Sequence, residues 1–243
     1  MRVKNKNYSR ALKSGLFLAI AFTPFFLQAT TLIHAGKLID GKSNKAQTKM
    51  TIVINDNLIT DVMKGYKKPK DDETLLDLKD HTVLPGLMDM HVHFGGEYQS
   101  KAERPSKVEK EMEAILATQD AYITFFAGFT TVRQVGDSGM VAISLRDAIK
   151  NGKVVGPRIF TSGKSIATTG GHADPTNGMA VSDYDYPLPE DGVVNGPYEV
   201  YTSVRQRYKD GADGIKITVT GGVLSEAKSG SNPQFTRKKL MLL

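Results

Sequence analysis

The chain has 243 residues, of which 40% are hydrophobic and 24% are charged, a composition typical of a globular protein with one large domain or two smaller ones. It contains no cysteine, which excludes disulfides, thiolate metal ligands and thiol nucleophiles. The net charge of +6 is concentrated at the N-terminus and therefore does not by itself indicate binding to nucleic acid.

Residues 1–29 have the order typical of a secretory signal peptide, which is charged, then apolar, then small. The segment has an apolar run over 15–27, the small residue Ala29 and no acid, and its five cations are Arg2, Lys4, Lys6, Arg10 and Lys13. Removing five cations from a net charge of +6 leaves +1. We expect cleavage near residue 29, export to the periplasm or the extracellular space, and no stable membrane span, because a spanning helix needs about 20 apolar residues. An uncleaved N-terminal anchor is the alternative.

Residues 30–83 are predicted to form a small β unit, one half of a composite β-sandwich. A short strand is expected at 31–33. Two apolar runs, 50–54 and 58–62, flank three turn-forming residues, which favours a hairpin. The charged, proline-containing stretch 64–73 is expected to be a loop.

From residue 84 the pattern changes to strands that alternate with helices. The expected strands are 84–94, 129–135, 157–162 and 214–220. The expected helices run from Ser106 to Gly128, over 140–150, and from Pro197 to Gly211. Strands connected by helices indicate a parallel sheet of βαβ units. We therefore expect an α/β fold in which residues 84–243 form the first half of a (β/α)8 (TIM) barrel, left incomplete.

Two details concern the ends and faces of the expected helices. Ser106 and Glu109 form a capping-box pair at the start of the first helix. In the third helix, Val200, Val204 and Tyr208 fall on one stripe, which is typical of a face that packs on a protein core.

The run Leu84–Phe94 carries the most specific chemical signal in the chain. Side chains alternate along a strand, so Asp89, His91 and His93 point to one face, and both histidines can bind one metal ion. Imidazole is a common ligand for such ions. The alternative is a pair of structural histidines in a polar pocket.

Lys216 lies in a second informative run, Gly214–Thr220. If this run is a strand, Ile215, Ile217 and Val219 face the helices, and Lys216, Thr218 and Thr220 face the barrel interior. A lysine that points inward is costly unless it is paired or chemically used. One use is reaction with CO₂ to form a carbamate that bridges two metal ions; the alternative is a structural salt bridge.

His172 lies in the long loop after the third expected strand. Loops of this kind contact substrate in barrel enzymes, so we interpret His172 as a substrate-binding residue, with a solvated loop histidine as the alternative. His34 and His81 belong to the N-terminal β unit and are interpreted as structural.

Several segments together resemble the amidohydrolase superfamily, and in particular its imidazolonepropionase-like, Xaa-Pro dipeptidase-type branch. They are, in family order, Leu84–Phe94, Thr130-Thr131-Val132-Arg133, Gly156-Pro157-Arg158, Ser162-Gly163, Thr169–Asp174 and Gly211–Thr220. The resemblance extends over 30–237. It implies a metal-dependent barrel with a flanking β-sandwich and hydrolysis of amide-type C–N bonds by metal-activated water.

The resemblance also implies roles for individual residues. It assigns His91 and His93 as first-strand metal ligands, Lys216 as the carboxylated lysine that bridges two metal ions, and His172 as a substrate-side contact. The two divalent ions are expected to be zinc, and manganese or iron is not excluded by these ligands. The expected partner is a small-molecule or dipeptide-like substrate, without nucleic acid, and self-association into a homo-oligomer is a further expectation.

The chain departs from the family pattern in two ways. Gln134 stands where an aspartate is expected. The family's histidines from the fifth and sixth strands and its catalytic aspartate from the eighth strand are absent, so no catalytic residue is assigned within the chain. We therefore expect a chain truncated after the fourth strand, by a frameshift, an early stop or an incomplete gene model, and inactive by itself. The alternative function is that of a non-catalytic fragment or pseudoenzyme.

Overall fold

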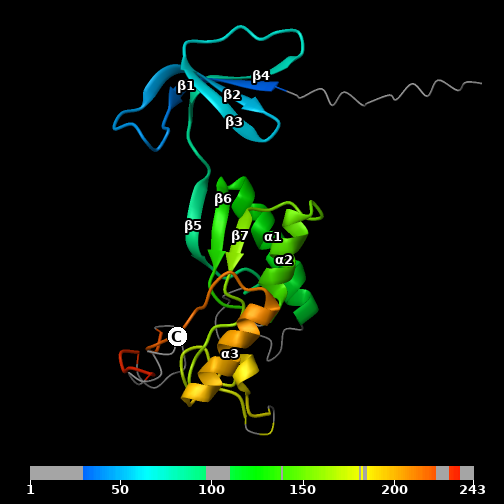
Figure 1. Ribbon diagram of the computed structural model, residues 1–243, viewed down its shortest axis with the longest axis vertical. Helices are drawn as coiled ribbons and strands as arrows, with labels where there is room; N and C mark the ends of the chain where they lie inside the picture. The colour runs from blue at the N-terminus through cyan, green and yellow to red at the C-terminus, as the bar shows by residue number, and fades with distance from the viewer. Residues whose placement is uncertain are drawn as a thin grey trace, which may run out of the picture. The chain divides into compact units, whose positions relative to one another are not determined.

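Figure 1 shows the computed structural model of the protein, which describes residues 30–96, 110–137, 139–180, 182, 185–222 and 230–235. The chain divides into two compact units, with the boundary between Pro85 and Gly86. The predicted signal segment 1–29 and the capping pair Ser106 and Glu109 lie outside the described residues. Within the described ranges, no helix is both long enough and apolar enough to cross a bilayer.

The first unit contains a four-stranded sheet in the order β3-β2-β1-β4. Its strands are β1 (Thr30–Leu38), β2 (Gln47–Asn55), β3 (Leu58–Lys64) and β4 (Glu73–Val83). β2 and β3 form the predicted hairpin, β1 pairs antiparallel with β2, and β1 pairs parallel with β4. The strand β1 is longer than the short strand predicted, and β4 is a strand that the sequence pattern does not predict. The buried residues Ala35, Leu38, Met50 and Ile52 form the core of this sheet.

The second unit is built on a parallel sheet in the order β5-β6-β7. Its strands are β5 (Leu87–Val92), β6 (Phe129–Gln134) and β7 (Arg158–Thr161), which confirms the first three strands predicted from residue 84 onward. The helices α1 (Lys110–Phe126) and α2 (Val141–Lys150) connect them in turn. Figure 1 shows the three arrows pointing the same way with α1 and α2 beside them.

The two faces of this sheet differ because side chains alternate along each strand. One face is apolar and packs on the helices. From the sheet side this core contains Val132, Ile159 and Phe94, and from α1 and α2 it contains Ala117, Ala121, Val141 and Leu145. The other face carries residues of opposite parity, among them His91, Arg133 and Phe160, which are exposed. The histidine pair therefore lies on the face away from α1 and α2.

The predicted fourth strand, 214–220, is not a regular strand. It forms isolated bridges, from Ile217 to Ile166 and from Thr220 to Pro233. Just before this run, the N–H of Asp213 donates a hydrogen bond to the carbonyl of Thr161, the last residue of β7, at 2.7 Å. β7 ends at Thr161, and the chain turns at Gly163, which has a φ of 59°. The run 214–220 therefore lies beside a loop that contains Ile166 and not beside a strand.

The helix α3 (Pro197–Asp210) is present as predicted and ends at Gly211, which has a φ of 85°. Its buried stripe differs from the prediction. Tyr208 is 87% exposed, and the buried positions are Val200, Ser203 and Arg207. A short 3-10 helix, η2 (Pro189–Asp191), precedes α3 and contacts it.

Candidate active site

A cavity of about 530 Å³ opens in the second unit beyond the ends of β5, β6 and β7. All four side chains singled out in the sequence line it: His91, His93, His172 and Lys216. They come from β5, from the turn that follows it, from the loop after β7 and from the segment after α3. The fold therefore brings together residues that are up to 125 positions apart, His91 and Lys216 being the most distant.

His91 and His93 approach each other closely, with their Nε2 atoms 3.1 Å apart. The Nδ1 atom of His93 lies 3.1 Å from the carbonyl oxygen of Gly136, which can accept a hydrogen bond from an Nδ1–H and so leave the lone pair on Nε2. Partial burial, followed by the positive charge of Lys216, lowers the pKa of His91 below its usual range. The His91 ring is therefore neutral at neutral pH, the form that binds metal ions.

Lys216 is held by its backbone at the cavity wall. Its carbonyl accepts a hydrogen bond from the N–H of Ile166 at 2.8 Å, and the N–H of Thr218 donates to the carbonyl of Ile166 at 3.0 Å. Lys216 and Thr218 line the cavity as predicted, and Ile217 between them packs on a core cluster with Ile166 and Val200. Ile215, Val219 and Thr220 are exposed, so the burial pattern predicted for a strand is seen only at the centre of this run.

The side chain of Lys216 is half-buried, which changes the pKa of its amine. Burial, and then the positive charge of Arg133, lower the pKa of the Lys216 amine. A lowered pKa increases the neutral fraction of an amine, which is the nucleophilic form. The same residue stays within electrostatic reach of two imidazoles, because its charge also contributes to lowering the pKa values of His91 and His172.

His172 is positioned by contacts on two sides. Its backbone N–H donates to the side-chain Oε1 of Gln234 at 3.0 Å. Its ring packs against Gly222, where an added Cβ would lie 2.4 Å from the ring atom Cε1. Partial burial, and then Lys216 and His93, lower the pKa of His172. His172 is therefore a neutral hydrogen-bonding group at the cavity.

Gln134, which departs from the family pattern, is buried at the end of β6. Its Oε1 accepts the N–H of Phe94 at 2.8 Å, and its Nε2 lies 3.5 Å from the carbonyl oxygen of Gly136, the same oxygen that His93 contacts. An amide both accepts and donates, whereas an ionised aspartate only accepts. Gln134 thus ties the turn after β5 to the turn after β6.

Three further cavity residues, Asp137, Lys164 and Asp191, were not identified from the sequence. Burial raises the pKa of the Asp137 carboxyl, which accepts backbone N–H groups of Gly139 at 3.0 Å and Ala142 at 2.8 Å. Its place between a strand and a helix is a helix-start signal that could have indicated it. Lys164 and Asp191 form an ion pair of 2.7 Å.

The side chains of His91, His93 and Lys216 could supply some of the ligands of a metal site, but not all of them. Two neutral imidazoles that converge at Nε2 are suitable nitrogen ligands for a divalent ion, and a carbamate on Lys216 would add an oxygen ligand. In the described part of the chain, no group of three or more His, Asp or Glu residues is placed to hold one ion.

The chain matches the model of the Amidohydrolase family over residues 82–242. Ochratoxinase of Aspergillus niger is 27% identical over 233 residues, which cover 88% of this chain and 47% of that protein. Enamidase of Eubacterium barkeri is 29% identical over 139 residues, which cover 55% of this chain and 35% of that protein.

Two solved structures are also similar. A Xaa-Pro dipeptidase with bound methionine in the active site is 73% identical, with a TM-score of 0.86 over 88% of this chain and 53% of that one. A prolidase complexed with N-methylphosphonate-L-proline is 28% identical, with a TM-score of 0.74 over 88% of this chain and 52% of that one. The α/β fold thus matches the N-terminal part of such barrels, and the chain spans about half the length of these relatives.

Proposed function

Because this chain belongs to the amidohydrolase family, we propose that it supplies the first metal ligands of a hydrolase that cleaves amide-type C–N bonds. The observation that carries the proposal is the approach of His91 and His93, whose Nε2 atoms are 3.1 Å apart at a cavity that Lys216 also lines. The cavity of about 530 Å³ is within the usual size for a small-molecule site.

The proposed metal centre uses side chains from separate segments of the second unit. His91 and His93 would hold one divalent ion, and a carbamate on Lys216 would bridge to a second. Zinc suits such nitrogen and oxygen donors. When bound, the ions lower the pKa of water and polarise the scissile carbonyl.

The chain's own residues prepare this chemistry. The contact between Nδ1 of His93 and the Gly136 carbonyl favours the tautomer in which Nε2 carries the lone pair that a metal ion would use. The Lys216 amine, neutral in greater proportion because its pKa is lowered, attacks the carbon of CO₂. A nitrogen–carbon bond forms, the amine releases a proton to solvent, and the product is an anionic carbamate. His172 donates a hydrogen bond to the substrate from the opposite loop.

We propose dipeptides of the Xaa-Pro class as substrates. The proposal is supported by the names of two similar proteins, the Xaa-Pro dipeptidase and the prolidase. The pattern of residues 1–29 supports a further proposal, that the protein acts after export from the cytoplasm.

A second candidate is a protein that binds such ligands without turnover. One observation favours it: the described residues hold no cluster of three or more His, Asp or Glu at one point. The oxygens of Asp137, a carboxyl at the cavity, already accept backbone N–H groups. For the 243 residues expressed alone we propose little turnover, because general acid–base catalysis contributes about 10²–10⁴-fold and both oxygens of Asp137 are engaged in this way.

Two forms of the protein separate the candidates. The first is the chain alone, and the second is the chain fused to the C-terminal half of the similar Xaa-Pro dipeptidase. Both are incubated with zinc and bicarbonate, metal content is measured by plasma mass spectrometry, and hydrolysis of an Xaa-Pro dipeptide panel is followed. Zinc-dependent hydrolysis by the fusion, lost in a matched fusion with His91→Ala, supports the hydrolase. A folded fusion that binds dipeptides but neither retains zinc nor hydrolyses them supports the second candidate.

A further inference from the structure

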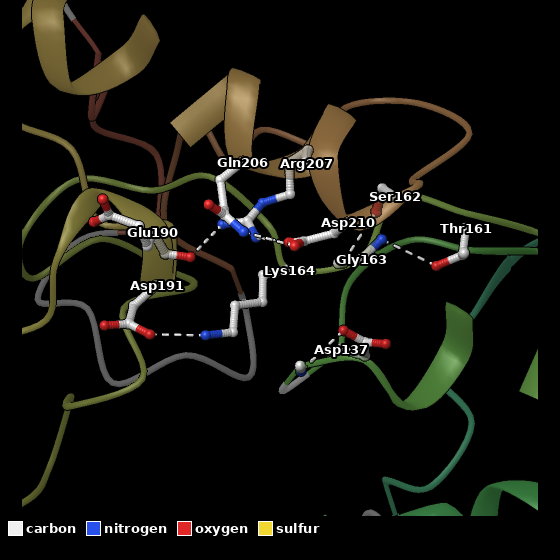
Figure 2. Close-up of polar contacts among 11 residues, drawn as sticks. Asp137, Thr161, Ser162, Gly163, Lys164, Glu190, Asp191, Gln206, Arg207 and Asp210 are labelled. Carbon is white, nitrogen blue, oxygen red and sulfur yellow. Dashed lines mark hydrogen bonds and ion pairs between the residues drawn. The ribbon is translucent and has the colours of Figure 1, made fainter. Parts of the chain in front are cut away.

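The cavity wall beyond the histidines carries an ion pair, Lys164 with Asp191. The Nζ atom of Lys164 lies 2.7 Å from Oδ1 of Asp191, and both residues line the cavity. Figure 2 shows the Lys164 side chain extending toward Asp191, with the pair joined by a dashed line. The side chains are 23% and 44% exposed, so a ligand in the cavity can reach them.

Asp191 is itself fixed in place. Its Oδ2 accepts the backbone N–H of Leu188 at 3.2 Å, on the side away from Lys164. The preceding carbonyl, that of Glu190, accepts a hydrogen bond from Nη2 of Arg207 at 2.8 Å. The Arg207 side chain is 2% exposed, and its Nη1 lies 3.4 Å from Oδ2 of Asp210. Figure 2 shows Arg207 between Glu190 and Asp210. A buried guanidinium on α3 therefore holds the short helix η2, which in turn sets where Asp191 directs the Lys164 ammonium.

The ammonium of Lys164 retains capacity for a ligand. An ammonium has three N–H donors. Within the described residues, one of them is used, in the bond to Asp191. The other cavity carboxyl, Asp137, accepts backbone N–H groups at the start of α2 and does not neutralise Lys164 through a contact. The cavity that the histidine pair lines thus also presents a cation that is held in place.

We propose that Lys164 binds the free carboxylate of the substrate and so selects peptides and N-acyl amino acids whose scissile amide is followed by an unblocked α-carboxylate. This inference rests on the proposed amide hydrolysis and names the substrate class of that site. Asp191 and Arg207 act as positioning residues. The carboxylate accepts hydrogen bonds from the two remaining donors of Lys164, while the amide lies toward His91 and His93.

The test compares two ligands that differ only in this group, N-acetyl-L-methionine and its primary amide. Their dissociation constants are measured by titration calorimetry with metal-free protein, so that the carboxylate cannot bind an ion. Wild type should bind the acid at least tenfold more tightly than the amide, because a hydrogen bond between charged groups contributes about ten- to a hundredfold. Lys164→Met should remove this preference, Lys164→Arg should retain part of it, and Lys153→Met, at an exposed lysine, should leave it unchanged.

The ratio of the affinities for the acid and the amide distinguishes a role of Lys164 in ligand selection from a purely structural role. If the ion pair only joins two loops, Lys164→Met lowers the thermal unfolding midpoint and weakens both ligands equally. An unchanged ratio in Lys164→Met overturns the proposal, as does wild-type protein that shows no preference or does not bind the acid. A chain that keeps the acid preference but fails the zinc and hydrolysis assays rejects the proposed function and leaves carboxylate recognition by Lys164 standing.

Discussion

The Nδ1 atom of His93 and the carbonyl oxygen of Gly136 lie 3.1 Å apart, which joins the turn after β5 to the turn after β6. The contact directs Nε2 of His93 toward Nε2 of His91. The proposed metal ligand and the backbone group that orients it therefore come from the turns after two neighbouring strands of one parallel sheet.

This arrangement predicts metal loss when either imidazole is removed. His91→Ala and His93→Ala should each retain less than about a tenth of the zinc bound by wild type, because one remaining imidazole is a poor site for a divalent ion. Plasma mass spectrometry after dialysis measures the zinc. His81→Ala, at an exposed position of the first unit, is the matched control. Unchanged zinc content in both site variants would contradict the assignment.

Lys216 is predicted to carry CO₂. With bicarbonate present, intact-protein mass spectrometry under mild conditions or ¹³C NMR with labelled bicarbonate should detect a carbamate in wild type and none in Lys216→Ala. The variant should also bind less zinc, with partial recovery when acetate supplies a carboxylate. Lys150→Ala, an exposed lysine of α2, controls for non-specific carbamates. A full zinc complement in Lys216→Ala would argue against a bridging role.

Asp137 should give the second unit a pH-dependent stability. Burial raises its folded-state pKa above the ordinary value of 3.8, so the folded protein holds this proton more tightly than the unfolded chain does. Its stabilising contribution is complete below pH 3.8 and is lost as the pH rises through the raised pKa. Urea unfolding of Asp137→Asn should therefore show a smaller fall in the free energy of unfolding over this range than wild type. Glu190→Gln, an exposed carboxyl, should follow wild type.

Removal of Arg207 should destabilise the second unit. Arg207→Ala leaves the Glu190 carbonyl without its donor and opens a cavity under α3, which together cost about 2–4 kcal/mol. Arg205→Ala, at an exposed position of the same helix, should change the free energy of unfolding by about 0.5 kcal/mol or less. Equal effects of the two substitutions in urea unfolding would show that the buried guanidinium does not support η2.

The N-terminal segment is predicted to be removed on export. Mass spectrometry of exported protein should find a new N-terminus near Thr30, because the cations, the apolar run and Ala29 have the order that signal peptidases cleave. Substituting Ala29 by a bulky residue should slow this processing. Recovery of protein that begins at Met1 from a soluble cytosolic pool would contradict the prediction.

The sequence predicts most elements of the second unit because their signals are local. Alternation around His91 and helical periodicity before Gly128 do not depend on distant residues. In the first unit, the strand β4 is not predicted. Its charged residues Asp77, Lys79 and Asp80 are typical of a loop, and its parallel pairing with β1 is a long-range contact that has no local signal in the sequence.

The two errors in the later part of the chain have physical causes. Tyr208 has the helical spacing of the apolar residues on α3, but it is exposed, and Arg207 is buried instead. The Arg207 guanidinium can be buried because it donates a hydrogen bond to the Glu190 carbonyl. The run 214–220 has strand composition, but after Thr161 it meets a loop instead of a strand. The ion pair of Lys164 and Asp191 joins a loop to the short helix η2, and neither segment is long enough to have a periodic signal in the sequence.

The bond from the Asp213 N–H to the Thr161 carbonyl lies three residues before Lys216 and fixes the register of this segment against β7. At its other end the connection is held by Ile166, whose N–H donates to the carbonyl of Lys216 at 2.8 Å. The residues between Asp213 and Lys216 therefore join two fixed points, and a change in their number would have to be absorbed without moving either one. This makes the connection a poor place for engineered loop insertions and a sensitive place for single-codon indels.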